Sequence, residues 1–159
     1  MTERQEEQLN FFFVRVFNRI LALEEQALGH TGCRDLSVRG LHVLEAVSVL
    51  REQGRNTMSQ IAELLNISVG ALTTSVNLLV NKGYLEKQAG ERDRRVTYVR
   101  LTEKGREAER LHREFHRELA RSVGEQLDGE SLKVLLRSLK ELEHFFVVRS
   151  ACLEGEGRL

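Results

Sequence analysis

The sequence predicts a mainly α fold: a winged helix-turn-helix with a two-stranded wing, flanked by long helices that form a dimerisation region. Three observations favour this fold class. A short helical pattern begins at Thr57 and a longer one follows Ser68. Two strand patterns come next and end at Leu101. Long amphipathic helical patterns precede and follow this unit. We expect residues 1–36 and 103–153 to form the helical dimerisation region, 37–102 the winged helix-turn-helix, and 154–159 a disordered tail.

The composition excludes some classes of protein. Lys and Arg together number 24, as do Asp and Glu, so the formal net charge is zero and only a local surplus of charge can attract a polyanion. No apolar run reaches the roughly 18 residues of a membrane span, so we expect a cytoplasmic protein without a membrane partner. Cys33 and Cys152 show no metal-binding or redox spacing, which favours small, semi-buried side chains over redox sensors.

Long apolar stripes mark both flanks of the winged unit. From Leu9 to Leu28, apolar residues recur every three or four positions, which predicts a long helix over this range, and additional phenylalanines widen its apolar stripe. Near the other end, Asp128 can cap a helix whose leucines alternate in the spacing of a helix-helix seam. A helix that is apolar on more than one side must bury more than one face, so we expect a homodimer.

The centre of the chain predicts two consecutive helices. Thr57 and Gln60 match a capping box, and Ser68 is a suitable N-cap for a second helix that Gly83 ends. One face of this second helix is apolar, and the other carries short polar side chains that can reach base edges and phosphates. The residues assigned to DNA contact on this face are Ser68, Gly70, Thr73, Thr74, Asn77 and Asn81. Taken alone, the segment also fits an ordinary amphipathic surface helix.

Two strand patterns follow, from Tyr84 to Ala89 and from Val96 to Leu101, and they enclose a charged turn. Between Lys82 and Arg106 there are eight basic and four acidic residues. Because the whole chain has no net charge, this local surplus marks the place where a polyanion would dock. The hairpin is therefore predicted to be a basic wing next to the second helix.

Several motifs in this region resemble the MarR family of winged-helix regulators. They are Leu64-Leu65-Asn66-Ile67-Ser68, Leu72-Thr73, Lys82-Gly83-Tyr84-Leu85, Asp93-Arg94-Arg95 and Leu101-Thr102-Glu103-Lys104-Gly105. The resemblance covers nearly the whole chain, and its most specific part is the wing motif with the Leu-Thr-x-x-Gly that follows it. It implies a dimeric, DNA-binding transcriptional regulator whose second helix lies in the major groove.

The same resemblance implies roles for the wing residues. Arg95 would enter the minor groove and Asp93 would hold it in place, since a guanidinium suits this narrow, electronegative groove. Arg94 would be a nearby phosphate or groove contact, and Arg92 belongs to the same basic tip. In a two-fold dimer, recognition helices about 34 Å apart would face successive major grooves, so the double-stranded DNA operator should be pseudo-palindromic.

Two histidines, His112 and His116, lie four residues apart on one predicted helix, a spacing that can bind a metal ion. The zinc-sensing repressors of this superfamily use a glutamate, a histidine and two such histidines, and the matching positions here are Glu24, His42, His112 and His116. The resemblance thus implies zinc as a candidate cofactor. The alternative is a set of partly buried imidazoles that form hydrogen bonds between helices.

A broader resemblance is to the fatty-acid-biosynthesis repressors of the superfamily, whose corepressor is acylated acyl carrier protein. It rests on the segments Phe17-Asn18, Glu24-Glu25, Thr73-Thr74-Ser75, Lys82-Gly83-Tyr84, Asp93-Arg94-Arg95 and Arg110-Leu111-His112-Arg113-x-Phe115-His116. Those repressors carry the same acid and histidines, so these residues do not discriminate between the two roles. We favour the fatty-acid role over zinc sensing; another effector, or none, is the remaining alternative.

An acidic carrier protein needs a basic docking surface. Arg113, Arg117 and Arg121 are four residues apart and are the candidates, although a solvated helix face is the simpler interpretation. An acyl chain would also need an apolar tunnel, and several phenylalanines could line one, although each is more simply a core residue.

An enzyme and a purely structural module were the competing classes. No glycine-rich phosphate loop, nucleophile elbow or catalytic metal motif is visible in the sequence, which argues against an enzyme. A structural dimerisation module would not need a basic wing. The sequence therefore predicts a DNA-binding transcriptional regulator, expected to act as a repressor.

Overall fold

The computed structural model describes residues 1–90, 93 and 95–156. Arg92, Arg94 and residues 157–159 of the expected tail lie outside the described residues. The chain forms two units, residues 1–116 and 117–159.

The first unit contains the winged helix-turn-helix. Its elements are α1 (Glu3–Gly29), α2 (Val38–Glu52), α3 (Met58–Leu64), α4 (Val69–Asn81), β1 (Leu85–Ala89), β2 (Thr97–Leu101) and the first part of α5 (Glu103–Glu125). The second unit contains the end of α5 and α6 (Gly129–Glu156). The predicted fold class, mainly helical with a two-stranded wing, is confirmed.

The helix-turn-helix begins and ends where its capping residues lie. The Thr57 hydroxyl accepts from the Gln60 amide over 3.4 Å to complete the capping box of α3. The Ser68 hydroxyl accepts from the Ala71 amide over 3.1 Å at the start of α4. Between the two helices, Asn66 takes the left-handed backbone conformation with φ of 50°, and Gly83 does so after α4 with φ of 77°.

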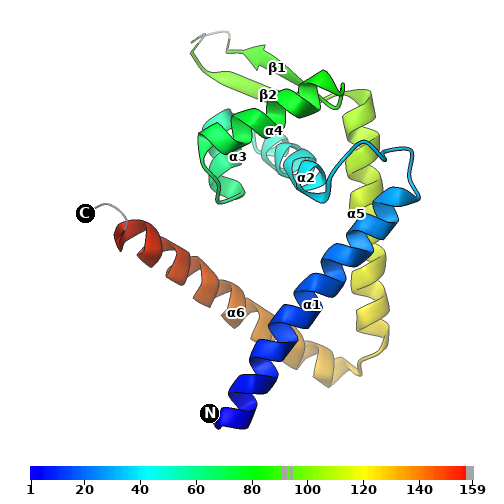
Figure 1. Ribbon diagram of the computed structural model, residues 1–159, viewed down its shortest axis with the longest axis vertical. Coiled ribbons are helices and arrows are strands. Elements are labelled where there is room, and N and C mark those ends of the chain that lie inside the picture. Colours follow the sequence, from blue (N-terminus) through cyan, green and yellow to red (C-terminus); the bar gives the residue numbers. More distant parts are fainter. Residues whose placement is uncertain (91–92, 94, 157–159) are drawn as a thin grey trace. The chain divides into compact units, whose positions relative to one another are not determined.

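The wing is an antiparallel hairpin that lies along α4 (Figure 1). Its register pairs Leu85 with Leu101 and Gln88 with Tyr98. Alternate residues of a strand face opposite sides, so Leu85, Val99 and Leu101 enter the core while Gln88, Tyr98 and Arg100 form the other face. One further bridge, between Thr57 and Tyr98, attaches the chain before α3 to the outer edge of β2.

The core lies between α2, α3, α4 and the wing. Its largest fully buried side chains are Tyr84, Leu44, Ile61, Leu72, Leu85, Val43, Val47, Val76 and Val99. Each fully buried leucine, valine or isoleucine contributes about 1.5–3 kcal/mol. This burial fixes the orientation of α4, whose opposite face remains in solvent.

No single helix among the described residues is long and apolar enough to cross a membrane. Helices α3 and α4 together have the required length and composition, but the pair is bent by 107°. Their apolar residues Ile61, Leu72 and Val76 are fully buried, so the apolar character of the pair belongs to the core.

Two helix boundaries extend beyond the expected ones. Helix α1 begins at Glu3 rather than near Leu9, because Thr2 and Gln5 form a capping box upstream of the apolar stripe. Helix α6 continues to Glu156, so residues 154–156, which were expected in a disordered tail, are helical.

Large apolar side chains remain exposed on the flanking helices. On α1, Phe11 and Phe17 have exposed fractions of 60% and 64%. On α6, in the second unit, Leu136, Phe145 and Val147 are also exposed. Apolar surface of this extent is typical of helices that pack against another copy of the chain.

The first turn of α5 lies directly against the end of α4 and the start of β1. The Thr102 hydroxyl donates to the Gly83 carbonyl over 2.7 Å and accepts from the Gly105 amide over 3.0 Å. The Thr102 amide donates to the Tyr84 carbonyl over 3.1 Å. A Cβ at Gly105 would lie 2.1 Å from the Tyr84 carbonyl oxygen, so only glycine fits there.

Tyr84 connects this contact to the link between α1 and α2. Its fully buried side chain donates through its hydroxyl to Asp35 Oδ1 over 2.6 Å. This hydrogen bond is the main reason why the pKa of Asp35 is lowered. The pKa of Tyr84 is raised, mainly by burial and secondly by the same hydrogen bond. The Lys104 ammonium lies 3.9 Å from the centre of the Tyr84 ring.

Gly105→Ala should destabilise the fold by about 2 kcal/mol or more, because the new methyl group collides with backbone that cannot move without shifting the wing. The matched control is Gly124→Ala, where a Cβ meets nothing within 4 Å and helix propensity should leave stability unchanged or raise it by up to about 1 kcal/mol. Chemical denaturation of both variants measures the difference. Equal stability of Gly105→Ala and the wild type would contradict the close packing described here.

Candidate functional site

The solvent-facing side of α4 carries the polar residues expected to contact DNA. Ser68, Gly70, Thr74, Asn77 and Asn81 are exposed, and Thr73 is half-buried. The hydroxyls of Thr73 and Thr74 donate to backbone carbonyls of the preceding turn over 2.7 and 3.3 Å. Each threonine therefore presents a methyl group and an acceptor oxygen, which suit thymine methyls and base amino groups.

Asn77 is held by the wing. The Lys87 ammonium of β1 donates to Asn77 Oδ1 over 2.6 Å. An ammonium can only donate, so the amide oxygen faces Lys87 and the NH₂ group is left for a partner in solvent. Sequence patterns did not indicate this contact, because it depends on the packing of β1 along α4.

The turn of the wing is shaped by Asp93. Its Oδ1 accepts from the backbone amide of Arg95 over 2.9 Å, and both residues are exposed. This hydrogen bond fixes the backbone of Arg95. It does not hold the Arg95 guanidinium, which was the role expected of Asp93.

Glu24 of α1, His42 of α2 and His112 and His116 of α5 converge in the first unit. Their ligand atoms all lie within 4.8 Å of one another. Glu24 Oε1 lies 2.9 Å from His116 Nε2 and 3.4 Å from His42 Nε2, and the Nε2 atoms of His112 and His116 are 3.2 Å apart. Neighbouring ligands of a tetrahedral zinc ion, bound at about 2.0–2.1 Å, are about 3.3 Å apart, so the donor set and its size fit zinc.

Burial prepares His112 as a neutral ligand. The pKa of His112 is lowered to about 4. Desolvation is the largest cause, and repulsion from His116 and His42 adds to it, while the nearby Glu24 acts in the opposite direction. The imidazole is therefore neutral near pH 7, which is the form that binds metal. Glu24 is also buried, with 3% of its surface exposed.

The same cluster also satisfies itself without a metal ion. The Glu24–His116 separation of 2.9 Å is a good charge-assisted hydrogen bond. Glu45 adds a second carboxylate, with its Oε2 lying 3.6 Å from His112 Nε2. Glu45 was not singled out in the sequence, because only the packing of α2 against α5 brings it to the cluster.

An apolar cavity lies next to the cluster. It measures about 30 Å³ and is lined by residues that include Leu28, Leu41, Ala108 and Phe115. That is roughly the space of one water molecule. An acyl chain would fit only if α1, α2 and α5 moved apart.

The three arginines considered for docking a carrier protein have different surroundings. In the first unit, Arg113 pairs over 2.7 Å with Glu109, whose exposed fraction is only 5%. Burial raises the pKa of Glu109 and Arg113 opposes this shift, so Arg113 compensates a buried carboxylate. Arg117 and Arg121 lie in the second unit, where both are exposed.

Comparison with known proteins places these features in a family. A family model described as a winged helix DNA-binding domain matches residues 36–105. The transcriptional regulator AdcR of Streptococcus pyogenes serotype M6 is 30% identical over 124 residues, which cover 78% of this chain and 82% of that protein.

Solved structures show the same architecture. The crystal structure of Streptococcus pneumoniae FabT in complex with DNA has a TM-score of 0.81 and 30% identity, over 89% of this chain and 96% of that chain. A mutant of E. coli MarR complexed with operator DNA has a TM-score of 0.65 over 89% of this chain and 99% of that chain; at 20% identity it shows the fold alone. These matches include both the winged unit and the flanking helices. The chain belongs to the MarR family of winged-helix, DNA-binding transcriptional regulators, which are not enzymes.

Proposed function

We propose that this regulator is a cytoplasmic homodimer that represses fatty-acid-biosynthesis genes and responds to acylated acyl carrier protein. The observation that carries the DNA-binding part is the exposed polar face of α4 beside a basic wing. Arg95 is proposed to enter the minor groove while Thr74 and Asn77 contact bases in the major groove.

Dimerisation is supported by the exposed apolar residues of α1 and, separately, of α6. Phe11 and Phe17 alone expose more than half of their surfaces. Two-fold symmetry would place two α4 helices about 34 Å apart and so require a pseudo-palindromic operator. The organisation proposed from the sequence, with residues 37–102 reading DNA and the flanks holding the dimer, is part of this proposal.

The fatty-acid role is supported by the sequence resemblance described above. The 30% identity to FabT, whose structure was solved in complex with DNA, extends along 89% of the chain and supports the DNA-binding part of the proposal. Arg117 and Arg121 are exposed and remain the candidate contacts for an acidic carrier, with Arg113 as a secondary one because it pairs with Glu109. The acyl chain is proposed to enter beside Phe115 by widening the small cavity there. The carrier would favour the DNA-binding state only if it binds that state more tightly.

A second candidate effector is zinc, and the converging Glu24, His42, His112 and His116 favour it. When bound there, zinc would link α1, α2 and α5 and supply binding energy for one arrangement of these helices. The neutral state of His112 leaves one of its ring nitrogens with a free lone pair for that link. The four positions are those implied by the resemblance to zinc-sensing repressors.

Arg95→Ala should weaken operator binding by about tenfold or more, or ~1.4 kcal/mol or more, because the guanidinium that suits the minor groove is lost. Its melting temperature should not change, since the side chain is exposed. The control is Arg149→Ala on α6. Gel-shift titrations measure both affinities, and a wild-type affinity for the Arg95 variant would show that this assignment is wrong.

Lys87→Met should relax base selectivity at one position in each half-site by about tenfold, because Asn77 is freed to rotate its amide and accept as well as donate. In the wild type, the favoured base should present an acceptor to the Asn77 NH₂ group. Lys140→Met, an exposed lysine of α6, is the control. Binding-site selection gives the preferences; a uniform loss of affinity without altered selectivity would instead mean that Lys87 contacts a phosphate.

The two effectors are separated by titrating operator complexes. Carrier protein with a C16 or C18 chain should tighten DNA binding while the unacylated carrier does little, because only the chain can use the apolar interior. No change at saturating acyl carrier rejects the fatty-acid role.

Zinc sensing predicts about one zinc per subunit and tighter DNA binding on zinc addition. His116→Ala should remove this response, and His30→Ala, an exposed histidine outside the cluster, should retain it. Elemental analysis at zero occupancy, with DNA binding indifferent to zinc, rejects this alternative.

A further inference from the structure

The outer face of the wing is hollowed. Of its described lining residues, Asp93 alone is among the proposed DNA contacts, and none belongs to the Glu/His cluster. The hollow measures about 700 Å³, within the range of roughly 300–1,000 Å³ for small-molecule sites. Its walls come from the end of α2, the link between α2 and α3, and both strands of the wing. All of these belong to the first unit.

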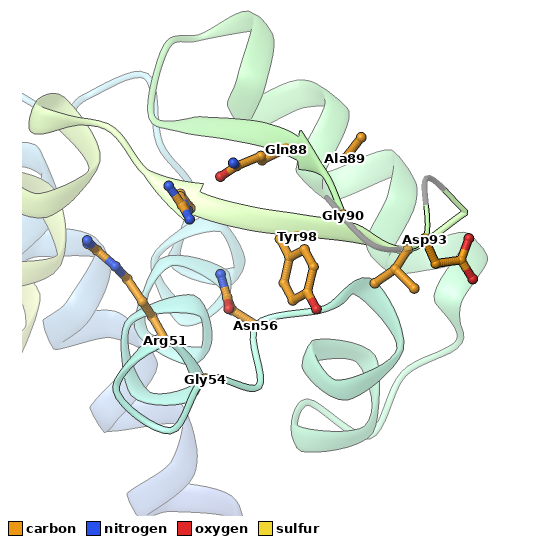
Figure 2. Close-up of a pocket in the computed structure, with 10 residues that line it drawn as sticks. Arg51, Gly54, Asn56, Gln88, Ala89, Gly90, Asp93 and Tyr98 are labelled. Carbon is orange, nitrogen blue, oxygen red and sulfur yellow. The ribbon is translucent and has the colours of Figure 1, made fainter.

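The register of the hairpin explains why this face is polar. Gln88 pairs with Tyr98, so both project to the side opposite the buried Val99 and Leu101. Lys87, which precedes Gln88 and pairs with the buried Val99, lies on the opposite face and donates a hydrogen bond to Asn77 of α4. The hollow therefore faces away from the recognition helix. Figure 2 shows Tyr98 projecting into it beside Asn56, with Arg51 entering from the end of α2.

Two arginines line the hollow without a partner among the described residues. Within the described part of the chain, the guanidiniums of Arg51 and Arg100 form no hydrogen bond or ion pair, and both residues are exposed. Glu86 is the cross-strand neighbour of Arg100, yet no ion pair joins them. On neighbouring α5, by contrast, Arg106 and Arg110 are paired with glutamates.

The other walls supply a ring surface and hydrogen-bonding groups. Tyr98 is half-buried, so part of its ring is open for stacking. Asn56 is fixed by donation to the Val99 carbonyl over 2.7 Å, which leaves its amide oxygen as an acceptor. Gln88 adds a second amide. Asp93, the acid among the described lining residues, already accepts from the Arg95 amide.

We propose that this hollow binds a small phosphorylated molecule that carries a heteroaromatic ring, of the nucleoside monophosphate class. The phosphate lies between Arg51 and Arg100, because guanidinium groups match its oxygens in bidentate geometry. The ring stacks on Tyr98 and exchanges hydrogen bonds with Asn56 and Gln88. A backbone phosphate of DNA offers the same anionic group without a free ring, so the test must separate these two sources.

The experiment is isothermal titration of the full-length protein, without DNA, with adenosine monophosphate and with inorganic phosphate. Saturable binding of the nucleotide is expected, with inorganic phosphate at least about tenfold weaker, since stacking of a base contributes about 1–3 kcal/mol. Arg51→Gln and Arg100→Gln should each weaken nucleotide binding about tenfold or more. Tyr98→Leu should weaken the nucleotide and leave inorganic phosphate unchanged.

The matched control is Arg106→Gln, an arginine of α5 that is paired with Glu103 and does not line this hollow. It should bind the nucleotide like the wild type. Thermal melts verify that every variant is folded. The proposal is overturned if the nucleotide does not bind or if it binds equally well to the two arginine variants. Gel shifts of the same variants with duplex DNA separate the two sources: a loss of affinity for DNA alone would identify the anion as a DNA phosphate and would also overturn the proposal.

Discussion

The contact between the first turn of α5 and the backbone of Tyr84 constrains the rest of the winged unit. Gly105 approaches the Tyr84 carbonyl so closely that a Cβ would lie 2.1 Å from its oxygen. Thr102 satisfies the Gly83 carbonyl and caps the same turn. The end of α4, the start of the wing and the start of α5 are therefore held at one point, and none of them can shift alone.

This contact gives a physical route between the two candidate sites of the first unit. His112 and His116 lie on α5, two to three turns after Gly105, and they meet Glu24 of α1 and His42 of α2. A ligand that drew these three helices together would displace α5, and the packing at Gly105 would pass that displacement to α4 and the wing. Such coupling needs a ligand with different affinities for the two arrangements, which applies equally to zinc and to an acyl chain.

Local signals predicted the winged unit well because its boundaries depend on local chemistry. The capping box at Thr57 and the N-cap at Ser68 form hydrogen bonds within three residues, so the sequence contains all of their partners. The predicted start of α1 was wrong because the apolar stripe begins at Leu9, whereas the helix begins six residues earlier, at a second capping box formed by Thr2 and Gln5. The roles of Arg92 and Arg94 lie outside the described residues and remain proposals.

The functional clusters were predictable only in part. The four ligand types were identified by resemblance, but their convergence within 4.8 Å is a result of tertiary packing. The contact of Lys87 with Asn77 depends on strand register, which has no local sequence signal. The same is true of the positions of Arg51 and Arg100, which have no ion-pair partner among the described residues and also depend on the link before α3. Arg113 was likewise expected to be a solvated charge or a docking residue, whereas the structure shows that it neutralises the buried carboxylate of Glu109.

We propose that α4 and the wing read DNA as one rigid unit. Chemical protection of the operator by the bound protein distinguishes the two contacts, because dimethyl sulfate reports guanine N7 in the major groove and adenine N3 in the minor groove. We expect two blocks of major-groove protection about one helical turn, or roughly 10 base pairs, apart, each with minor-groove protection next to it. Arg95→Ala should remove only the minor-groove protection. Major-groove protection without adjacent minor-groove protection in the wild type, or a single unpaired block, would show that α4 and the wing do not bind DNA together.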